Sequence, residues 1–207
     1  MAGSAYFPGV AIRNPDFAGT PHHAALVRIT HWINTLSFFG LLISGIAILL
    51  AHPRLYWGET GNVGTPSLLN LPLPFILTGQ TGWGRSLHFL SAWVCVLNGL
   101  LYVISGLITQ HFRKDHAYNV VQRLTYIAVV AILFPIMIWT GLAMSPAITS
   151  VFPALVTSLG GQQSARTIHF FVADFLVLFL IVHITMVSLA GFTTHVRAMI
   201  IGGKDRP

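Results

Sequence analysis

Long apolar stretches alternate along the chain with short segments that hold most of its charged residues. Four stretches contain almost no Lys, Arg, Asp or Glu: residues 29–53, 86–112, 124–165 and 167–196, the last interrupted only by Asp174. About 20 apolar residues cross a bilayer as a helix, so the pattern predicts four spans, near 27–50, 87–110, 120–144 and 167–192. The hydrophobicity is continuous rather than alternating, which favours helices over the strands of a membrane barrel.

The composition supports this interpretation. Hydrophobic residues make up 54% of the 207 residues and charged residues only 8%, whereas a soluble domain carries about 25% charged residues. We therefore expect an all-α integral membrane protein, a four-helix bundle formed by residues 26–200, with cytoplasmic segments at residues 1–25 and 201–207. Pro135 should kink the third span. Residues 51–85, rich in proline and glycine, should contain no regular helix.

The distribution of basic residues predicts the orientation. With four spans, both termini and the 111–122 connection share one side, which carries Arg13, Arg28, Arg113, Lys114, Arg123, Arg197, Lys204 and Arg206. The opposite side carries only Arg54, Arg85 and Arg166. The positive-inside rule then places both termini in the cytoplasm. The net charge of +6 reflects this topology and contact with lipid headgroups, and we expect no nucleic-acid partner.

Two further features limit what the chain can be. The first 25 residues lack the apolar core of a cleaved signal peptide, so we expect the first span to serve as an uncleaved anchor. The lone Cys95 excludes an intrachain disulfide and is expected to pack inside the second span.

Four of the ten histidines lie inside the predicted spans, where ionisable groups are costly and usually functional: His31, His88, His169 and His183. His169 and His183 are 14 residues apart, which is about 21 Å along a helix and close to four full turns, so both should share one face. The first two spans run in opposite directions. The depth of His31 therefore matches that of His183 near the cytoplasm, and His88 matches His169 near the outer side.

Two imidazoles that face each other across a helix bundle predict a haem held by two axial histidines. Zinc would need about four clustered ligands, whereas these histidines lie at two depths. The alternative is that they are hydrogen-bonded core residues, which is the usual explanation for a single histidine. It is less convincing for four at matched depths.

Glycines offer a second indication of room for a cofactor. Gly99 and Gly106 return to the face of His88, and Gly45 lies 14 residues after His31. A missing side chain there would let a helix pass the edge of a haem. Ordinary packing of small residues explains any one of these glycines equally well.

An arginine precedes three of the four histidines by three residues: Arg28, Arg85 and Arg166. Residues at this spacing share a helix face, so we predict that these arginines contact haem propionates, Arg28 at the inner haem and the other two at the outer. The alternative is that they mark the membrane boundary by snorkelling. The third span begins with Arg123-Leu-Thr-Tyr126, which suits a helix that closes the bundle without binding iron.

Asp174 is the single carboxylate inside a predicted span. It lies five residues after His169, about 140° around the helix, so we expect it to face away from the haems. It could bond to a neighbouring span or face a partner subunit, and a role in a proton relay is a less favoured alternative.

His31-Trp32, Arg85-x-x-His88 and the His169…His183 pair together resemble the bacterial cytochrome b561 / nickel-hydrogenase b-subunit superfamily, over residues 22–200. The likeness is greatest to the di-haem membrane subunits of periplasmic molybdopterin and nickel–iron enzymes, including the formate dehydrogenase gamma and thiosulfate reductase branches. It implies two b haems, exchange of electrons with quinone, a periplasmic redox partner and a bacterial inner membrane. It also implies a quinone site by the inner haem, which here would comprise Asn34, His111, Asp115 and His116. A solvated loop is the alternative for the last three.

We therefore predict an electron-transfer subunit of a respiratory oxidoreductase complex, without catalytic residues of its own, because no molybdopterin, iron–sulfur or flavin motif is present. One alternative is a stand-alone superoxide:quinone oxidoreductase of the same fold, in which Arg85 and Arg166 attract the anion. Another is a histidine-rich metal transporter, although the spans offer few polar residues besides histidine, Asn98 and Asp174.

Overall fold

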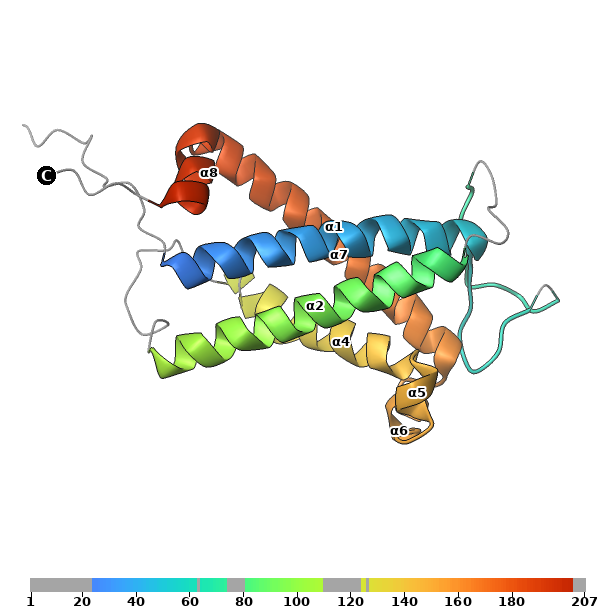
Figure 1. The fold of residues 1–207 in the computed structure, drawn as a ribbon. Helices are drawn as coiled ribbons and strands as arrows, with labels where there is room; N and C mark the ends of the chain where they lie inside the picture. Colours follow the sequence, from blue (N-terminus) through green and yellow to red (C-terminus); the bar gives the residue numbers. More distant parts are fainter. Residues whose placement is uncertain (1–23, 63, 74–80, 110–123, 126, 203–207) are drawn as a thin grey trace, which may run out of the picture.

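The computed structural model describes residues 24–62, 64–73, 81–109, 124–125 and 127–202, most of them in helices (Figure 1). Three helices are long and apolar enough to cross a membrane: α1 (Ala25–Ala51), α2 (Thr81–Ile108) and α7 (Gln162–Leu189). A shorter apolar helix comprises the π-helical turn η2 (Val129–Leu133) and α4 (Phe134–Ala143). Large apolar side chains on the long helices are exposed, such as Leu36 at 72% and Leu107 at 66%, as expected where lipid is the solvent.

Helices α1 and α2 form a closely packed antiparallel pair (Figure 1). Most of their buried positions lie seven residues apart: Thr30, Ser37 and Ser44 on α1, and Gly84, Ser91 and Asn98 on α2. This repeat is typical of helices that pack at a shallow left-handed angle, and small residues let two helices approach closely. At Gly40 a side chain is excluded, because its Cβ would lie 2.5 Å from the Ser91 hydroxyl oxygen.

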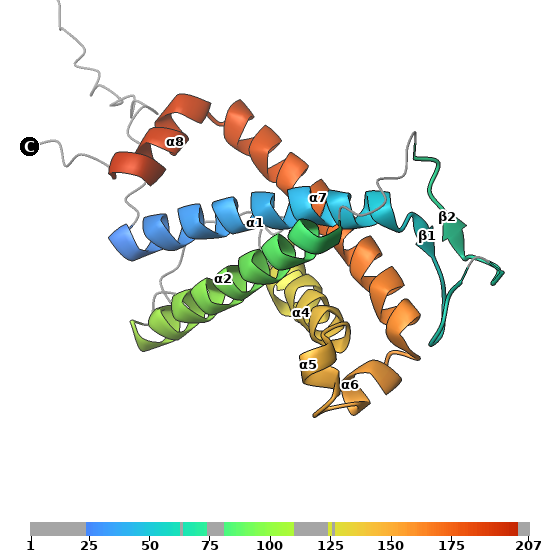
Figure 2. The same ribbon diagram turned by 45° about the vertical axis from the view of Figure 1, so that its right-hand side comes forward.

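Helix α7 packs against α4 and crosses α1 obliquely (Figure 2). The connection from α4 to α7 contains two one-turn helices, α5 (Pro146–Thr149) and α6 (Ala154–Thr157). Since the closest backbone packing is within the α1–α2 pair and the α4–α7 pair, side chains that point from α7 toward α1 and α2 meet between these pairs.

A two-stranded hairpin covers the first turns of α7. Its strands, β1 (Arg54–Leu55) and β2 (Leu69–Asn70), pair antiparallel. The Thr167 hydroxyl donates to the Tyr56 carbonyl over 2.6 Å, and the Gly58 N–H donates to the Ser164 hydroxyl oxygen over 2.8 Å. These bonds attach the segment that contains the hairpin to the helix that carries His169.

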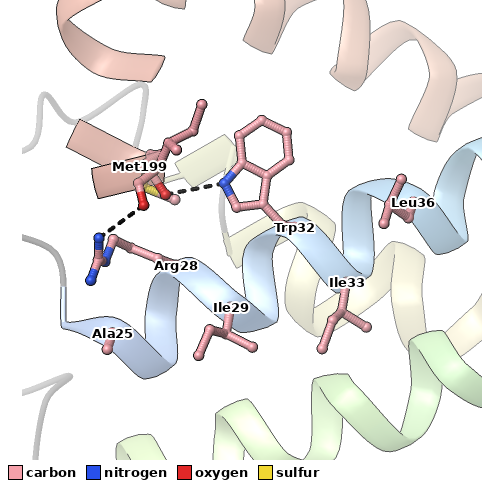
Figure 3. A pocket seen from close by; sticks show the side chains of 8 residues that line it. Ala25, Arg28, Ile29, Trp32, Ile33, Leu36 and Met199 are labelled. Atoms are coloured by element: carbon pink, nitrogen blue, oxygen red, sulfur yellow. Dashed lines mark hydrogen bonds between the residues drawn. The ribbon is translucent and has the colours of Figure 1, made fainter. Parts of the chain in front are cut away.

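Helix α8 (Phe192–Ile201) follows Gly191, whose φ of 109° is in the left-handed region, and returns to the start of α1. There the Trp32 indole N–H donates to the Met199 carbonyl and the Arg28 guanidinium donates to the Ile200 carbonyl, each over 3.1 Å (Figure 3). Arg28 is thus placed where the helix dipole of α8 is negative. Both side chains border a pocket of about 320 Å³ whose other walls are mainly apolar.

The predicted element boundaries need correction at α2. The helix begins at Thr81, and α1 includes Ala51. The prediction that residues 51–85 contain no regular helix was therefore wrong for Ala51 and for the last five residues, and the predicted span near 87–110 starts too late. Even in the middle of a helix, glycine costs only about 0.5–1 kcal/mol relative to alanine. Gly84 is buried where a Cβ would lie 3.4 Å from that of Ala47, so close packing on α1 stabilises the helix.

The remaining boundaries differ less. Helix α7 begins at Gln162 and ends at Leu189, against the predicted 167–192. Residues 120–123 and 126 of the predicted third span lie outside the described residues. Just before Pro135, where a kink is predicted, the Phe134 N–H bonds to the Val129 carbonyl five residues back, a π-turn that interrupts the regular helix. The kink itself stays a prediction.

Candidate haem-ligand sites

The structure brings the four span histidines together as two pairs, with the predicted partners. His31 of α1 faces His183 of α7, with ring centres 6.5 Å apart and planes inclined by 48°. His88 of α2 faces His169 of α7, with ring centres 6.2 Å apart and planes inclined by 61°. The pairing predicted from depth is confirmed, while ligation of iron by these residues stays a prediction.

The spacing of each pair fits one metal ion between two imidazoles. A metal–imidazole bond of about 2 Å, plus about 1 Å from the nitrogen to the ring centre, gives about 6 Å between two ring centres on opposite sides of a metal. Within the described part of the chain, no group of three or more His, Cys, Asp and Glu residues could hold a metal ion. The pairs therefore suit a cofactor that supplies its own equatorial ligands, as haem does.

The His88–His169 pair is the outer pair of the predicted topology. Each of its histidines also contacts a hydroxyl that was not predicted from the sequence. His88 Nδ1 lies 3.0 Å from Ser44 Oγ, and His169 Nδ1 lies 2.9 Å from Thr140 Oγ1. Ser44 and Thr140 each precede a glycine. The same step occurs at Ser105-Gly106 of α2, so the sequence alone does not single out these two hydroxyls.

The three glycines that were predicted to leave room for a cofactor differ in their surroundings. Gly45 lies beside the outer pair, where an added Cβ would be 3.7 Å from His88 Cε1. At Gly99 a Cβ would meet nothing within 4 Å, so this position borders open space. Gly106 is buried. Gly45 and Gly99 thus leave room on α1 and α2.

The His31–His183 pair, the inner pair of the predicted topology, has aromatic neighbours. The Trp32 indole meets the His31 ring edge-on at 5.5 Å, and the Phe179 ring stacks on His183 at 6.0 Å. Asn34, predicted to belong to a quinone site, lies one turn after His31 and accepts a 2.7 Å hydrogen bond from the Asn98 amide. The other predicted quinone residues lie outside the described residues: His111, Asp115 and His116.

Two of the three predicted propionate arginines donate to backbone carbonyls. Arg28 bonds to Ile200, and Arg166 bonds to the carbonyls of His52 and Arg54. A guanidinium has five N–H donors, so both keep donors for an anion. Arg85 is exposed at the same end of the bundle as Arg166.

The charges of these arginines change the pKa of His52, which lies just beyond α1. Partial burial lowers the pKa of its imidazole below the ordinary value, and the nearby charges of Arg166 and Arg85 lower it further. Arg85 and Arg166 therefore place positive charge at the end of the bundle that holds the His88–His169 pair.

Asp174 is exposed on α7 together with Phe171, Phe175 and Leu178. This exposed face is consistent with the prediction that the carboxylate points away from the histidine pairs.

Comparison with known proteins agrees with an arrangement of paired histidines between membrane helices. Residues 22–202 match the family model of prokaryotic cytochrome b561. The chain belongs to this family. Cytochrome b561 proteins are bacterial membrane proteins that bind haem b and transfer electrons, so this chain is a membrane haem b electron-transfer protein.

A relative of this cytochrome b561 protein comes from Azospira oryzae and is named as a protein-methionine-sulfoxide reductase subunit, YedZ1. It is 29% identical over 193 residues, which cover 81% of this chain and 90% of the relative. No solved structure matches the chain.

Proposed function

We propose that this cytochrome b561 protein holds two b haems and passes electrons between quinone in the membrane and a periplasmic redox protein. The observation that carries the proposal is the presence of two histidine pairs at haem spacing, 6.5 and 6.2 Å, at two levels of α7. Bound haem iron supplies the one-electron redox chemistry.

The chain's own residues position the cofactors. His31 and His183 would hold the inner haem, and His88 and His169 the outer one. Because α7 supplies one ligand to each pair, 14 residues apart, the two sites lie about 21 Å apart along this helix.

The arginines would balance the negative charge of the propionates. Arg85 and Arg166 lie near the outer pair and Arg28 near the inner pair, one turn before a histidine in each case. The contacts of Arg28 and Arg166 with backbone carbonyls hold these side chains in place, so they can present their remaining N–H groups without losing much side-chain entropy.

The proposed topology places four helices across a bacterial inner membrane, with both termini in the cytoplasm. The shorter apolar helix Val129–Ala143 would complete the third span with the residues that precede it. Quinone would bind at the cytoplasmic side, near Asn34 and the connection that contains His111, Asp115 and His116.

A periplasmic partner would dock over the hairpin. Arg54 and Trp57 are exposed there, Trp57 at 61%, and the hairpin is bonded to the first turns of α7 two residues before His169. Exposed arginine and tryptophan side chains are typical of protein interfaces. The name of the Azospira oryzae relative supports a reductase as the kind of partner, in keeping with the molybdopterin or hydrogenase-type partner that the sequence resemblance implies.

The test is the haem content of the purified chain and its reduction by quinol. We expect two b haems per chain, both reduced when a quinol is added to the protein in proteoliposomes. A chain that folds without haem would overturn the proposal. Two haems that quinol cannot reduce would overturn its quinone half alone.

A further inference from the structure

Each outer histidine rests against a hydroxyl followed by a glycine on the neighbouring helix. His88 of α2 meets Ser44-Gly45 of α1, and the Nδ1–Oγ distance is 3.0 Å. His169 of α7 meets Thr140-Gly141 of α4, and the corresponding distance is 2.9 Å. A Cβ on either glycine would lie 3.7 or 3.6 Å from the Cε1 atom of the ring. The same two-residue step thus holds both rings of the pair.

The direction of these hydrogen bonds follows from the other contact of each hydroxyl. Ser44 Oγ lies 2.6 Å from the Gly40 carbonyl oxygen, and Thr140 Oγ1 lies 2.8 Å from that of Ile136. A carbonyl only accepts, and a hydroxyl has a single proton to donate. The proton of each hydroxyl therefore goes to its own helix, and its oxygen accepts from the imidazole Nδ1–H.

This arrangement selects one tautomer for both rings. With the proton on Nδ1, the lone pair is on Nε2, the nitrogen that would bind iron. Both hydroxyl-bearing residues are fully buried, Ser44 and Thr140 each at 0% exposure, so water does not compete for the Nδ1 proton. The hydrogen bond also fixes the rotation of each ring.

We propose that Ser44 and Thr140 are positioning residues that hold the two outer histidines in the tautomer that binds iron through Nε2. This inference rests on the proposed haem ligation. It also gives α4 a role, because a helix that supplies no ligand to this pair still orients His169.

The hydroxyls should affect the outer site alone. A hydrogen bond from the second ring nitrogen makes a ligating imidazole more basic, and a more basic ligand stabilises oxidised iron. Loss of the bond should therefore raise the midpoint potential of the outer haem. The rings next to the inner histidines belong to Trp32 and Phe179, so the inner potential should stay unchanged.

The experiment is a potentiometric titration of the purified full chain, followed by optical and low-temperature EPR spectra. Ser44→Ala and Thr140→Val remove one hydroxyl each, on different helices, so each variant tests the inference independently. We expect either variant to raise one of the two potentials and to change one of the two EPR signals. Ser44→Thr and Thr140→Ser should keep the wild-type potential, because the hydroxyl is restored.

Ser37→Ala on α1 and Ser105→Ala on α2 are matched controls, since each removes a hydroxyl that bonds to a carbonyl of its own helix. They should leave both potentials unchanged. The inference is overturned if Ser44→Ala and Thr140→Val leave the outer potential unchanged, or if the hydroxyl-retaining variants shift it equally. A wild-type chain without haem overturns the proposed function as well, so the two failures are distinguishable.

Discussion

His31 and His183 face each other with ring centres 6.5 Å apart, although they belong to the first turns of α1 and the second half of α7. The equivalent contact at the other level joins His88 to His169. Helix α7 therefore contributes to both sites, while α1 and α2 contribute to one each. The two sites share a helix but no ligand, so they can be separated by single substitutions.

His183→Ala should remove the inner haem and retain the outer one, because only the inner pair loses a ligand. We expect the haem-to-protein ratio to fall from about two to about one, measured by pyridine haemochrome assay. His195→Ala on α8 is the matched control: it removes an imidazole near the same end of the chain, outside both pairs, and should retain both haems. An unchanged ratio in His183→Ala would contradict the assignment of this pair.

Arg85→Gln and Arg166→Gln should each lower the midpoint potential of the outer haem, because a nearby positive charge favours reduced iron. We expect shifts of tens of millivolts, where about 59 mV corresponds to a tenfold change for a one-electron couple. Arg197→Gln on α8, at the other end of the bundle, should leave the outer potential unchanged. Redox titration of the purified chain measures these shifts. Unchanged potentials in both Arg85→Gln and Arg166→Gln would exclude a contact between these arginines and the haem propionates.

The sequence predicted the histidine pairs because helix geometry is regular. A rotation of 100° per residue relates His169 to His183 without knowledge of any neighbour, and the opposite directions of the first two spans supply the partners. The hydroxyls could not be predicted in the same way. Serine and threonine in apolar helices commonly bond to a carbonyl of their own helix, as Ser37 and Thr185 do here, and the sequence does not indicate which of them also meet an imidazole.

The outer hairpin and α8 were beyond prediction for a related reason. Both are held by bonds between residues that are far apart in the chain, such as Thr167 with Tyr56 and Trp32 with Met199. Their own segments carry only a weak local pattern. Hydropathy locates the spans, while the segments outside them take their structure from the helices on which they fold.

His52 should make the outer end of the bundle sensitive to acid. Burial and the charges of Arg166 and Arg85 lower its pKa in the folded chain, whereas the unfolded chain has the ordinary value of about 6.5. The resulting stabilisation is complete above about pH 6.5 and is lost as the pH falls through the folded pKa. Thermal loss of haem absorbance should therefore occur at lower temperature near pH 5 than near pH 7. His52→Gln should reduce this difference between pH 5 and pH 7. An identical pH dependence in the variant would show that His52 is not the source of the acid sensitivity.

Trp32→Phe should loosen α8 without affecting the haem ligands. The substitution keeps an aromatic ring beside His31 but removes the N–H that bonds to the Met199 carbonyl over 3.1 Å. Loss of such a bond costs about 0.5–1.5 kcal/mol. We expect faster amide hydrogen exchange across Phe192–Ile201 and a haem content like that of the wild type. Trp139→Phe on α4, which loses a 3.3 Å bond to the Leu155 carbonyl, should leave the exchange of α8 unchanged.

Gly161→Ala should detach the hairpin from α7 and destabilise the outer site. Gly161 has a φ of 117°, and a Cβ there would lie 2.5 Å from the Gly58 carbonyl group, so backbone would have to move. Gly58→Ala is the control, because its φ of 100° imposes similar strain but its Cβ would meet nothing within 4 Å. Strain alone costs about 1–3 kcal/mol, so both variants lose stability and Gly161→Ala loses more. Equal midpoints of thermal haem loss in the two variants would show that the contact between the hairpin and α7 adds nothing to the stability of the outer site.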